Sequence, residues 1–156
     1  MSKNVQIDAI DRRILEIIQR DATYSIQDIG EQVGLSTNPC WRRIKRMEDA
    51  GIIERRVAIL NPVKLGLGVT AFVSIRTNKH TPDWLASFAA GIRSIPEIIE
   101  CHRMSGDVDY LLKIAVADIA HYDRIYQELI AAVPGLSDVS STFSMERLKY
   151  GTALAI

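Results

Sequence analysis

The sequence predicts an α+β protein in which three short N-terminal helices precede a β-α-β-β-α-β unit. Two observations carry this prediction. Apolar residues recur every three or four positions up to about residue 50, and from residue 69 they follow a strand-like pattern. A stretch containing Asn-Pro and two glycines separates the two patterns. We therefore expect two domains, residues 1–52 and 67–156, joined by a hinge strand over residues 53–66.

Length and composition allow a hydrophobic core and exclude several classes of protein. The 156 residues are 47% hydrophobic and 24% charged, as in globular proteins. The 19 basic and 19 acidic side chains cancel, so any affinity for nucleic acid must come from a local cluster. The longest uncharged stretch, Leu65 to Ile75, has 11 residues and is too short to span a membrane. With no signal-peptide pattern and two distant cysteines, we expect a reduced cytoplasmic protein without metal or cofactor.

The first two predicted helices begin at good capping residues. Asp8 is a favourable N-cap for a helix over residues 8–20, whose isoleucines form one apolar stripe. Ser25 begins a second helix, and Asp28 stands three residues later in a variant of the capping box. Gly34 ends this helix, because glycine adopts positive φ without strain. A tight turn therefore leads into the third helix, which completes a helix-turn-helix pattern.

The third helix, capped by Ser36 and running to about Ala50, places cations opposite its apolar face. On a helical wheel Cys40, Ile44 and Met47 share the buried side. The outward residue types suit DNA, since Arg pairs with guanine and Asn with adenine in the major groove. A basic run alone would more often be a solvated face, but the capped helix and turn before it favour recognition. The expected DNA contacts on this helix are Ser36, Thr37, Asn38, Trp41, Arg42, Arg43, Lys45 and Arg46.

Two arginines interrupt the apolar run that follows the third helix. The segment IIERRVAIL resembles a strand, with Arg55 and Arg56 between two apolar portions. In a winged helix-turn-helix these arginines would contact DNA phosphates. In the alternative interpretation the segment is a linker strand that pairs with a second copy of the chain. The sequence supports the wing and the linker strand equally.

The remaining residues predict a four-stranded antiparallel sheet of the ferredoxin-like type. Helices begin at Pro82 and at the N-cap Asp118, and Ser105-Gly106-Asp107 forms a tight hairpin. With both helices on one face, the other face is left uncovered, and we expect it to pack on a second subunit. The expected strands are Val69–Arg76, Ile98–Met104, Asp107–Val116 and Val139–Leu148, with a short one at Thr152–Ile156.

Two motifs in this order resemble the Lrp/AsnC family of bacterial and archaeal transcription regulators, most of all its leucine-responsive branch. They are LSTNPCWRRIKRMEDAGIIERRVAILNP and, about 45 residues later, SGDVDYLLK. The resemblance implies a DNA-binding helix-turn-helix, a hinge, and an amino-acid-sensing domain of RAM/ACT-like fold. It also implies nucleoid-associated homodimers that assemble into octamers or related rings. A two-fold dimer places two recognition helices in successive major grooves, so the operator is expected to be an imperfect palindrome.

The same resemblance places an effector site near the Gly-Asp hairpin, where dimers meet. The chemistry fits a free amino acid, because Asp107 or Asp109 can bind the ammonium and hairpin N–H groups the carboxylate. If the strand pleat continues through the hairpin, the two carboxylates share a face. Alternatively, Asp107 only makes the turn and Gly106 only supplies positive φ. The expected effector contacts are Met104, Ser105, Gly106, Asp107, Asp109 and Tyr110.

Two other functions compete with an amino-acid-responsive regulator. Sirohaem decarboxylases resemble the family in architecture, and His102 and Arg103 are the nearby candidates for binding a tetrapyrrole. The basic third helix argues against such an enzyme, and the sequence lacks a nucleophile elbow, a P-loop and GxGxxG. An architectural DNA-binding protein without an effector is the second alternative. We therefore expect a regulator rather than an enzyme.

Overall fold

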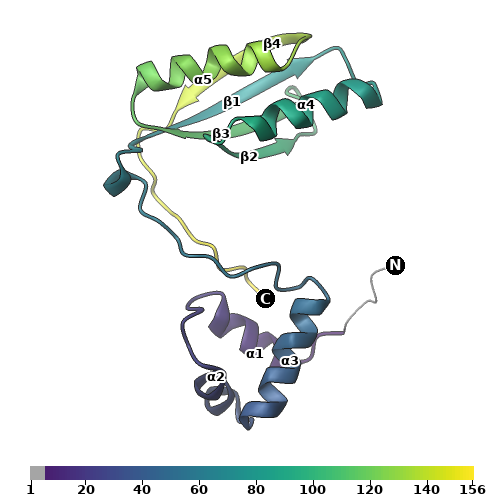
Figure 1. Ribbon diagram of the computed structural model, residues 1–156, viewed down its shortest axis with the longest axis vertical. Coiled ribbons are helices and arrows are strands. Elements are labelled where there is room, and N and C mark those ends of the chain that lie inside the picture. The colour runs from purple at the N-terminus through teal and green to yellow at the C-terminus, as the bar shows by residue number, and fades with distance from the viewer. Residues whose placement is uncertain (1–5) are drawn as a thin grey trace. The chain divides into compact units, whose positions relative to one another are not determined.

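The computed structural model describes residues 6–156, and the chain divides into two compact units (Figure 1). Lys149–Ile156 belongs to the same unit as the residues up to Ile59, and Leu60–Leu148 forms the other unit. The chain therefore passes between the units twice, whereas the sequence-based division kept residues 149–156 with the second domain. The first unit contains α1 (Ala9–Ile18), α2 (Ile26–Val33) and α3 (Thr37–Asp49). The second contains η1 (Val63–Leu65), β1 (Val69–Thr77), α4 (Pro82–Ser94), β2 (Ile98–Arg103), β3 (Tyr110–Val116), α5 (Ile119–Ala132) and β4 (Leu136–Phe143).

Reciprocal capping boxes begin α1 and α2. The Asp8 carboxylate accepts the Asp11 N–H at 2.8 Å, and the Asp11 carboxylate accepts the Asp8 N–H at 3.1 Å. Ser25 and Asp28 make the same exchange at the start of α2. Each exchange satisfies two N–H groups that a helix start leaves without partners. The buried core of the three helices is Ile14, Ile18, Ile29, Val33, Cys40, Ile44 and Met47.

A close approach of the chain at Gly30 sets the turn between α2 and α3. Gly34 has φ 76°, and the Leu35 N–H donates to the Gly30 carbonyl at 2.8 Å. A Cβ on Gly30 would lie only 2.7 Å from the Leu35 carbonyl oxygen. The absence of a side chain at Gly30 therefore lets the turn pack on α2 and bring α3 across it.

The second unit is a four-stranded sheet, ordered β2-β3-β1-β4, with α4 and α5 packed on one face (Figure 1). All neighbouring strands are antiparallel, which confirms the ferredoxin-like order. Alternate residues point into the core, among them Val73 and Ile75 of β1 and Leu112 of β3, all fully buried. Phe72, which pairs with Lys113 on the opposite face, is 37% exposed. The predicted uncovered face is therefore present.

The ends of several predicted strands were wrong, because a strand extends only as far as its partner. The last strand is Leu136–Phe143 rather than Val139–Leu148. Its pairing with β1 begins with Leu136 opposite Thr77 and ends with Phe143 opposite Ala71. Residues 152–156 form no strand, and residues 54–61 are extended, exposed and unpaired within the described part of the chain. The predicted hinge strand therefore has no partner strand among residues 6–156. No helix within residues 6–156 is long and apolar enough to cross a lipid bilayer.

Candidate nucleic-acid interface and candidate ligand site

Helix α3 turns a polar, cationic surface outward while its apolar side is buried. Cys40, Ile44 and Met47 are at most 3% exposed, as the wheel predicted. The Ser36 hydroxyl makes no side-chain cap hydrogen bond, so it stays available to a ligand. The exposed residues on this surface are Ser36, Thr37, Asn38, Trp41, Arg42, Lys45 and Arg46, whereas Arg43 is half-buried.

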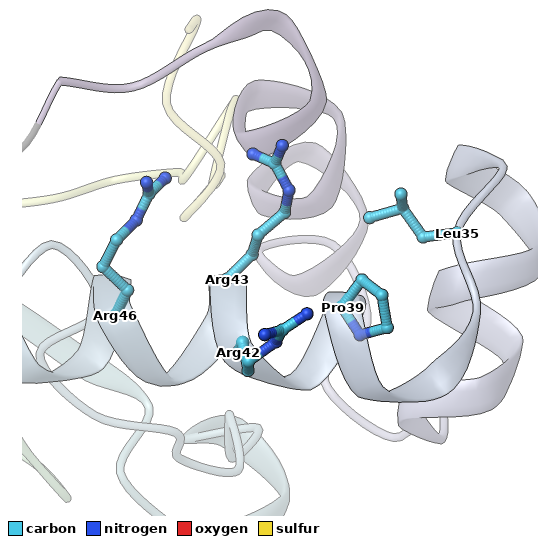
Figure 2. A pocket seen from close by; sticks show the side chains of 5 residues that line it. All are labelled: Leu35, Pro39, Arg42, Arg43 and Arg46. Carbon is cyan, nitrogen blue, oxygen red and sulfur yellow. The ribbon is translucent and has the colours of Figure 1, made fainter.

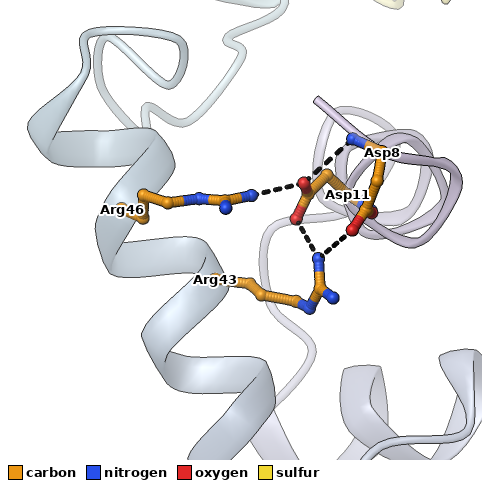
Figure 3. Close-up of polar contacts among 4 residues, drawn as sticks. All are labelled: Asp8, Asp11, Arg43 and Arg46. Carbon is orange, nitrogen blue, oxygen red and sulfur yellow. Dashed lines mark hydrogen bonds and ion pairs between the residues drawn. The ribbon is translucent and has the colours of Figure 1, made fainter. Parts of the chain in front are cut away.

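Two of the arginines expected to contact DNA are bound to the start of α1 (Figure 3). The Arg43 guanidinium donates to Asp8 at 2.7 Å and to Asp11 at 2.9 Å. Arg46 donates to the other oxygen of the fully buried Asp11 carboxylate. The sequence predicted Arg43 and Arg46 as DNA contacts without these partners, and in the structure both form ion pairs with α1.

The capping box of α1 and the Arg43 guanidinium together lower the pKa of Asp8. The Asp11 N–H and then Arg43 hold the pKa of Asp8 at about 2, below its usual 3.8. Hydrogen bonds to Asp8 and then Asp11 raise the pKa of Arg43 above its usual value. The Asp8 charge is therefore stabilised first by the capping box and then by Arg43, whereas the Arg43 charge is stabilised by the contact between α1 and α3.

The other cations of this region differ in whether they have a partner. Lys45 pairs with Asp49 at 2.8 Å, one turn along α3, and this hydrogen bond raises the pKa of Lys45. Arg56 pairs with Glu48 at 3.1 Å. Arg42 and Arg55 make no ion pair or hydrogen bond to any residue between 6 and 156. Arg42 is consequently the arginine of α3 that is both exposed and unpaired.

A depression of about 360 Å³ lies beside α3 at its junction with the α2–α3 turn (Figure 2). Leu35 and Pro39 line it with apolar surface, and Arg42 lines it with an unpaired cation. Arg43 and Arg46 complete the lining from the next turns of the helix. Apolar surface beside guanidinium groups suits the sugar and phosphate of a nucleic acid strand.

In the second unit, Asp109 makes hydrogen bonds to other parts of the fold. Its carboxylate accepts the Thr77 N–H at 2.8 Å, and its own N–H donates to the Ile75 carbonyl at 2.9 Å. Its carbonyl accepts the Met104 N–H at 2.8 Å. Asp109 thus joins the end of β1 to both sides of the hairpin, which accounts for its position without a ligand.

Asp107 lies at the exposed tip of the hairpin. Its backbone carbonyl accepts from Arg76 at 2.7 Å, while its carboxylate has no partner among the residues that the structure describes. Met104, Ser105 and Gly106, with φ 127°, are exposed beside it. Regular pairing of β3 starts only at Tyr110, so the pleat does not continue through the hairpin, and the condition for a shared aspartate face is not met.

Tyr110 points into the core rather than to the hairpin surface. It is 5% exposed, and its ring centroid lies 4.2 Å from that of Phe88. Its hydroxyl has no hydrogen-bond partner within the described chain. The structure therefore separates the expected effector residues into an exposed tip, the partly exposed Asp109 that is hydrogen-bonded to β1, and the buried Tyr110.

Sequence reasoning missed the Asp11 contact, although a signal was present. Asp11 precedes Ile14 and Ile18 by three and seven positions, so it lies on the apolar stripe of α1. A carboxylate on a buried stripe needs a cationic partner, because burying an unpaired charge is costly. The two arginines on the flank of α3 supply that partner.

Comparison with known proteins finds two family models that match successive parts of the chain. Residues 7–54 match the model of winged helix-turn-helix DNA-binding domains. Residues 70–154 match the model of the Lrp/AsnC ligand binding domain. A helix-turn-helix unit with an outward cationic helix, joined to a ligand-binding α+β unit, defines a ligand-responsive DNA-binding regulator. The chain belongs to the Lrp/AsnC family of transcriptional regulators.

Relatives cover nearly the whole chain. The DNA-binding transcriptional activator DecR of Escherichia coli K12 is 48% identical, over 96% of this chain and 99% of its own length. An AsnC family regulator from Agrobacterium tumefaciens has a TM-score of 0.91 at 52% identity, covering 96% of this chain and 97% of that one. A Neisseria meningitidis regulator, solved as an L-Met complex, has a TM-score of 0.89 at 32% identity, covering 96% and 97%. These relatives are named as regulators, so the enzymatic alternative gains no support from them.

Proposed function

We propose that this protein binds imperfectly palindromic operator DNA through α3 of two subunits, and that a small amino acid modulates this binding. The carrying observation is the exposed surface of α3, on which Arg42 is unpaired beside Asn38 and Trp41. The N-terminal residues of a recognition helix enter the major groove, where Arg and Asn read base edges. We propose accordingly that the protein acts on the nucleoid, in the cytoplasm of a bacterial or archaeal cell.

Selection from a random duplex library tests the DNA proposal without knowledge of the operator. We expect enrichment of two inverted half-sites whose centres lie roughly 10–10.5 base pairs, or a multiple, apart. The wild-type chain and Arg42→Ala are selected in parallel, so that base pairs read by Arg42 lose enrichment only in the variant. Enrichment of no sequence by the wild type would favour the architectural alternative.

The amino-acid proposal rests on the free Asp107 carboxylate at the hairpin tip and on the ligand-binding class of the second unit. An amino acid presents an ammonium group that a carboxylate can bind through a charge-assisted hydrogen bond. The related regulator solved with L-Met, together with the resemblance to the leucine-responsive branch, favours an apolar, leucine-like side chain.

A thermal-shift screen of the twenty amino acids identifies the effector. A ligand at about 100 times its dissociation constant adds roughly 2.7 kcal/mol to stability, which is readily detected as a higher Tm. We expect a response to one or a few apolar amino acids and none to their amides, which lack the carboxylate. A uniform absence of response would remove the effector from the proposal and leave the DNA-binding part standing.

Assembly through the uncovered sheet face is the third part of the proposal. This face presents Phe72 at 37% exposure, beside Lys113 and opposite the helices. Covering it with a second copy would give a dimer, and further association would give an octamer or related ring. Light scattering with Phe72→Glu as the variant tests this: the wild type should be larger than a monomer, and the variant should lose mass.

A further inference from the structure

We infer that Asp11 is a positioning residue for DNA recognition: it holds Arg43 and Arg46 on α1 and leaves Arg42 as the arginine of α3 that contacts DNA. This inference rests on the proposed DNA binding. Nothing in the family match assigns such a division of labour among the arginines. It follows from the contacts at the start of α1 (Figure 3).

All four carboxylate oxygens of Asp8 and Asp11 are engaged. Asp8 uses one oxygen to accept the Asp11 N–H and the other to accept from Arg43. Asp11 uses one oxygen for Arg43 and the other for both Arg46 and the Asp8 N–H. Two carboxylates and two guanidiniums therefore form a neutral network in which every acceptor is occupied.

Burial makes this network hard to open. The Asp11 side chain is 0% exposed, whereas the Arg46 side chain is 45% exposed. Arg43 and Arg46 each donate to a different oxygen of Asp11, so the departure of either one would leave one oxygen of a buried carboxylate without its cation. Removing a cation from a buried carboxylate costs more free energy than an exposed ion pair with a phosphate contributes. We therefore expect both arginines to stay on Asp11 when DNA binds.

The same contacts orient α3. Arg43 and Arg46 stand three residues apart, so together they anchor nearly one turn of the helix against α1. Two anchors on one flank set the rotation of α3 about its own axis. Arg42, about 100° around the helix from Arg43, then makes no ion pair with α1, although all three arginines line the same depression (Figure 2).

The salt dependence of binding to a mixed-sequence DNA duplex tests the inference on the full chain. Each phosphate contact contributes about 0.9 to the slope of log affinity against log salt. We compare Arg42→Gln with Arg46→Gln, matched substitutions of exposed arginines one turn apart. A mixed-sequence duplex offers Arg42 no matching base edge, so there its cation faces phosphates, and Arg42→Gln should flatten the slope by about 0.9. Its affinity deficit on this duplex should then shrink by roughly threefold to fourfold between 50 and 200 mM salt. Arg46→Gln and Arg43→Gln should leave the slope unchanged.

Asp11→Asn provides the opposite perturbation. Loss of the charge should release Arg46, steepen the slope by up to about 0.9, and lower the ratio of operator to mixed-sequence affinity. A purely structural role for Asp11 would weaken binding without steepening the slope, and that result would overturn the inference. Should Asp11→Asn fail to fold by circular dichroism, the arginine comparison decides alone.

The arginine variants can also overturn the inference. If Arg46→Gln or Arg43→Gln flattens the slope as much as Arg42→Gln, these guanidiniums leave Asp11 for phosphates and the inference is wrong. If the wild type itself shows no salt-dependent affinity for duplex DNA, the proposed function fails instead. The two failures are therefore distinguishable.

Discussion

The side-chain amide of Gln19 pairs with both backbone groups of Leu154. Its Nε2 donates to the Leu154 carbonyl at 2.9 Å, and its Oε1 accepts the Leu154 N–H at 2.8 Å. Gln19 is the C-cap of α1, so this contact attaches the C-terminal segment, residues 149–156, to the helix-turn-helix unit. The pairing imitates the two-bond exchange of an antiparallel strand pair, although neither partner lies in a strand.

We expect Gln19→Ala to release the C-terminal segment. Removing the amide deletes both hydrogen bonds, so the Leu154 amide should exchange its hydrogen faster, and carboxypeptidase should trim the chain faster. Gln19→Glu is the matched control, because it keeps the acceptor and loses the donor. The exchange rate of the Leu154 amide in this variant should fall between those of the wild type and Gln19→Ala. Equal exchange rates in all three proteins would show that other contacts hold the segment.

Arg42→Ala should cost about 1–3 kcal/mol of operator affinity and relax discrimination at particular base pairs. The reason is that Arg42 is exposed and makes no ion pair with the rest of the described chain, so its donors are free for a base edge. Gel-shift titration of single-base operator variants measures this effect. An equal loss on every sequence would reassign Arg42 to the phosphate backbone.

Stability should depend on the ionisation of Asp8. Its pKa is about 2 in the folded protein and 3.8 as the ordinary value, so the folded state favours the charged form. The stabilisation is complete above the ordinary pKa and is lost as pH falls through the folded pKa. Asp8→Asn retains a good N-cap but lacks this charge.

Thermal unfolding between pH 3 and 6 checks this prediction. The difference in Tm between the wild type and Asp8→Asn should be constant above about pH 5 and shrink as the pH falls toward 3. Because Asp8 is exposed, added salt should reduce the difference. A difference that is constant over the whole range would contradict the shifted pKa.

The two hairpin aspartates should respond differently to the same substitution. Asp107→Asn should weaken amino-acid binding by roughly 1.5–3 kcal/mol and leave the fold unchanged, since its carboxylate has no described protein partner. Asp109→Asn should lower the stability of the second unit, because it removes the charge that strengthens the hydrogen bond from the Thr77 N–H and replaces the oxygen that faces His80 by an NH2 group. Calorimetric titration and thermal unfolding on both variants separate the roles. An unaltered ligand affinity in Asp107→Asn would show that Asp107 only forms the turn.

Gly30→Ala should destabilise the helix-turn-helix unit, although the same change inside most helices stabilises by about 1 kcal/mol. The added Cβ would lie 2.7 Å from the Leu35 carbonyl oxygen, so the α2–α3 turn must shift. Overpacking of this kind costs typically about 1–3 kcal/mol, which exceeds the gain in helix propensity. Urea unfolding followed by circular dichroism measures the balance, and a net gain in stability would refute this account.

Local pattern alone determined the elements of this protein and their order. Capping residues such as Asp8 and Ser25, and the turn at Gly34, act within a few residues, so their effects are readable along the chain. The apolar period, which changes from helical to strand-like, likewise predicted the helix-turn-helix and the four-stranded sheet. These signals depend on backbone geometry that neighbouring residues share.

Tertiary structure decided which charges are free and where strands end. Arg42, Arg43 and Arg46 look alike in the sequence, yet only contact with Asp11, 32 or more positions away, distinguishes them. Asp107 and Asp109 are likewise similar until the end of β1 engages one of them. Pairing energies of this kind depend on distance and burial in three dimensions, and a helical wheel or a strand alternation carries neither quantity.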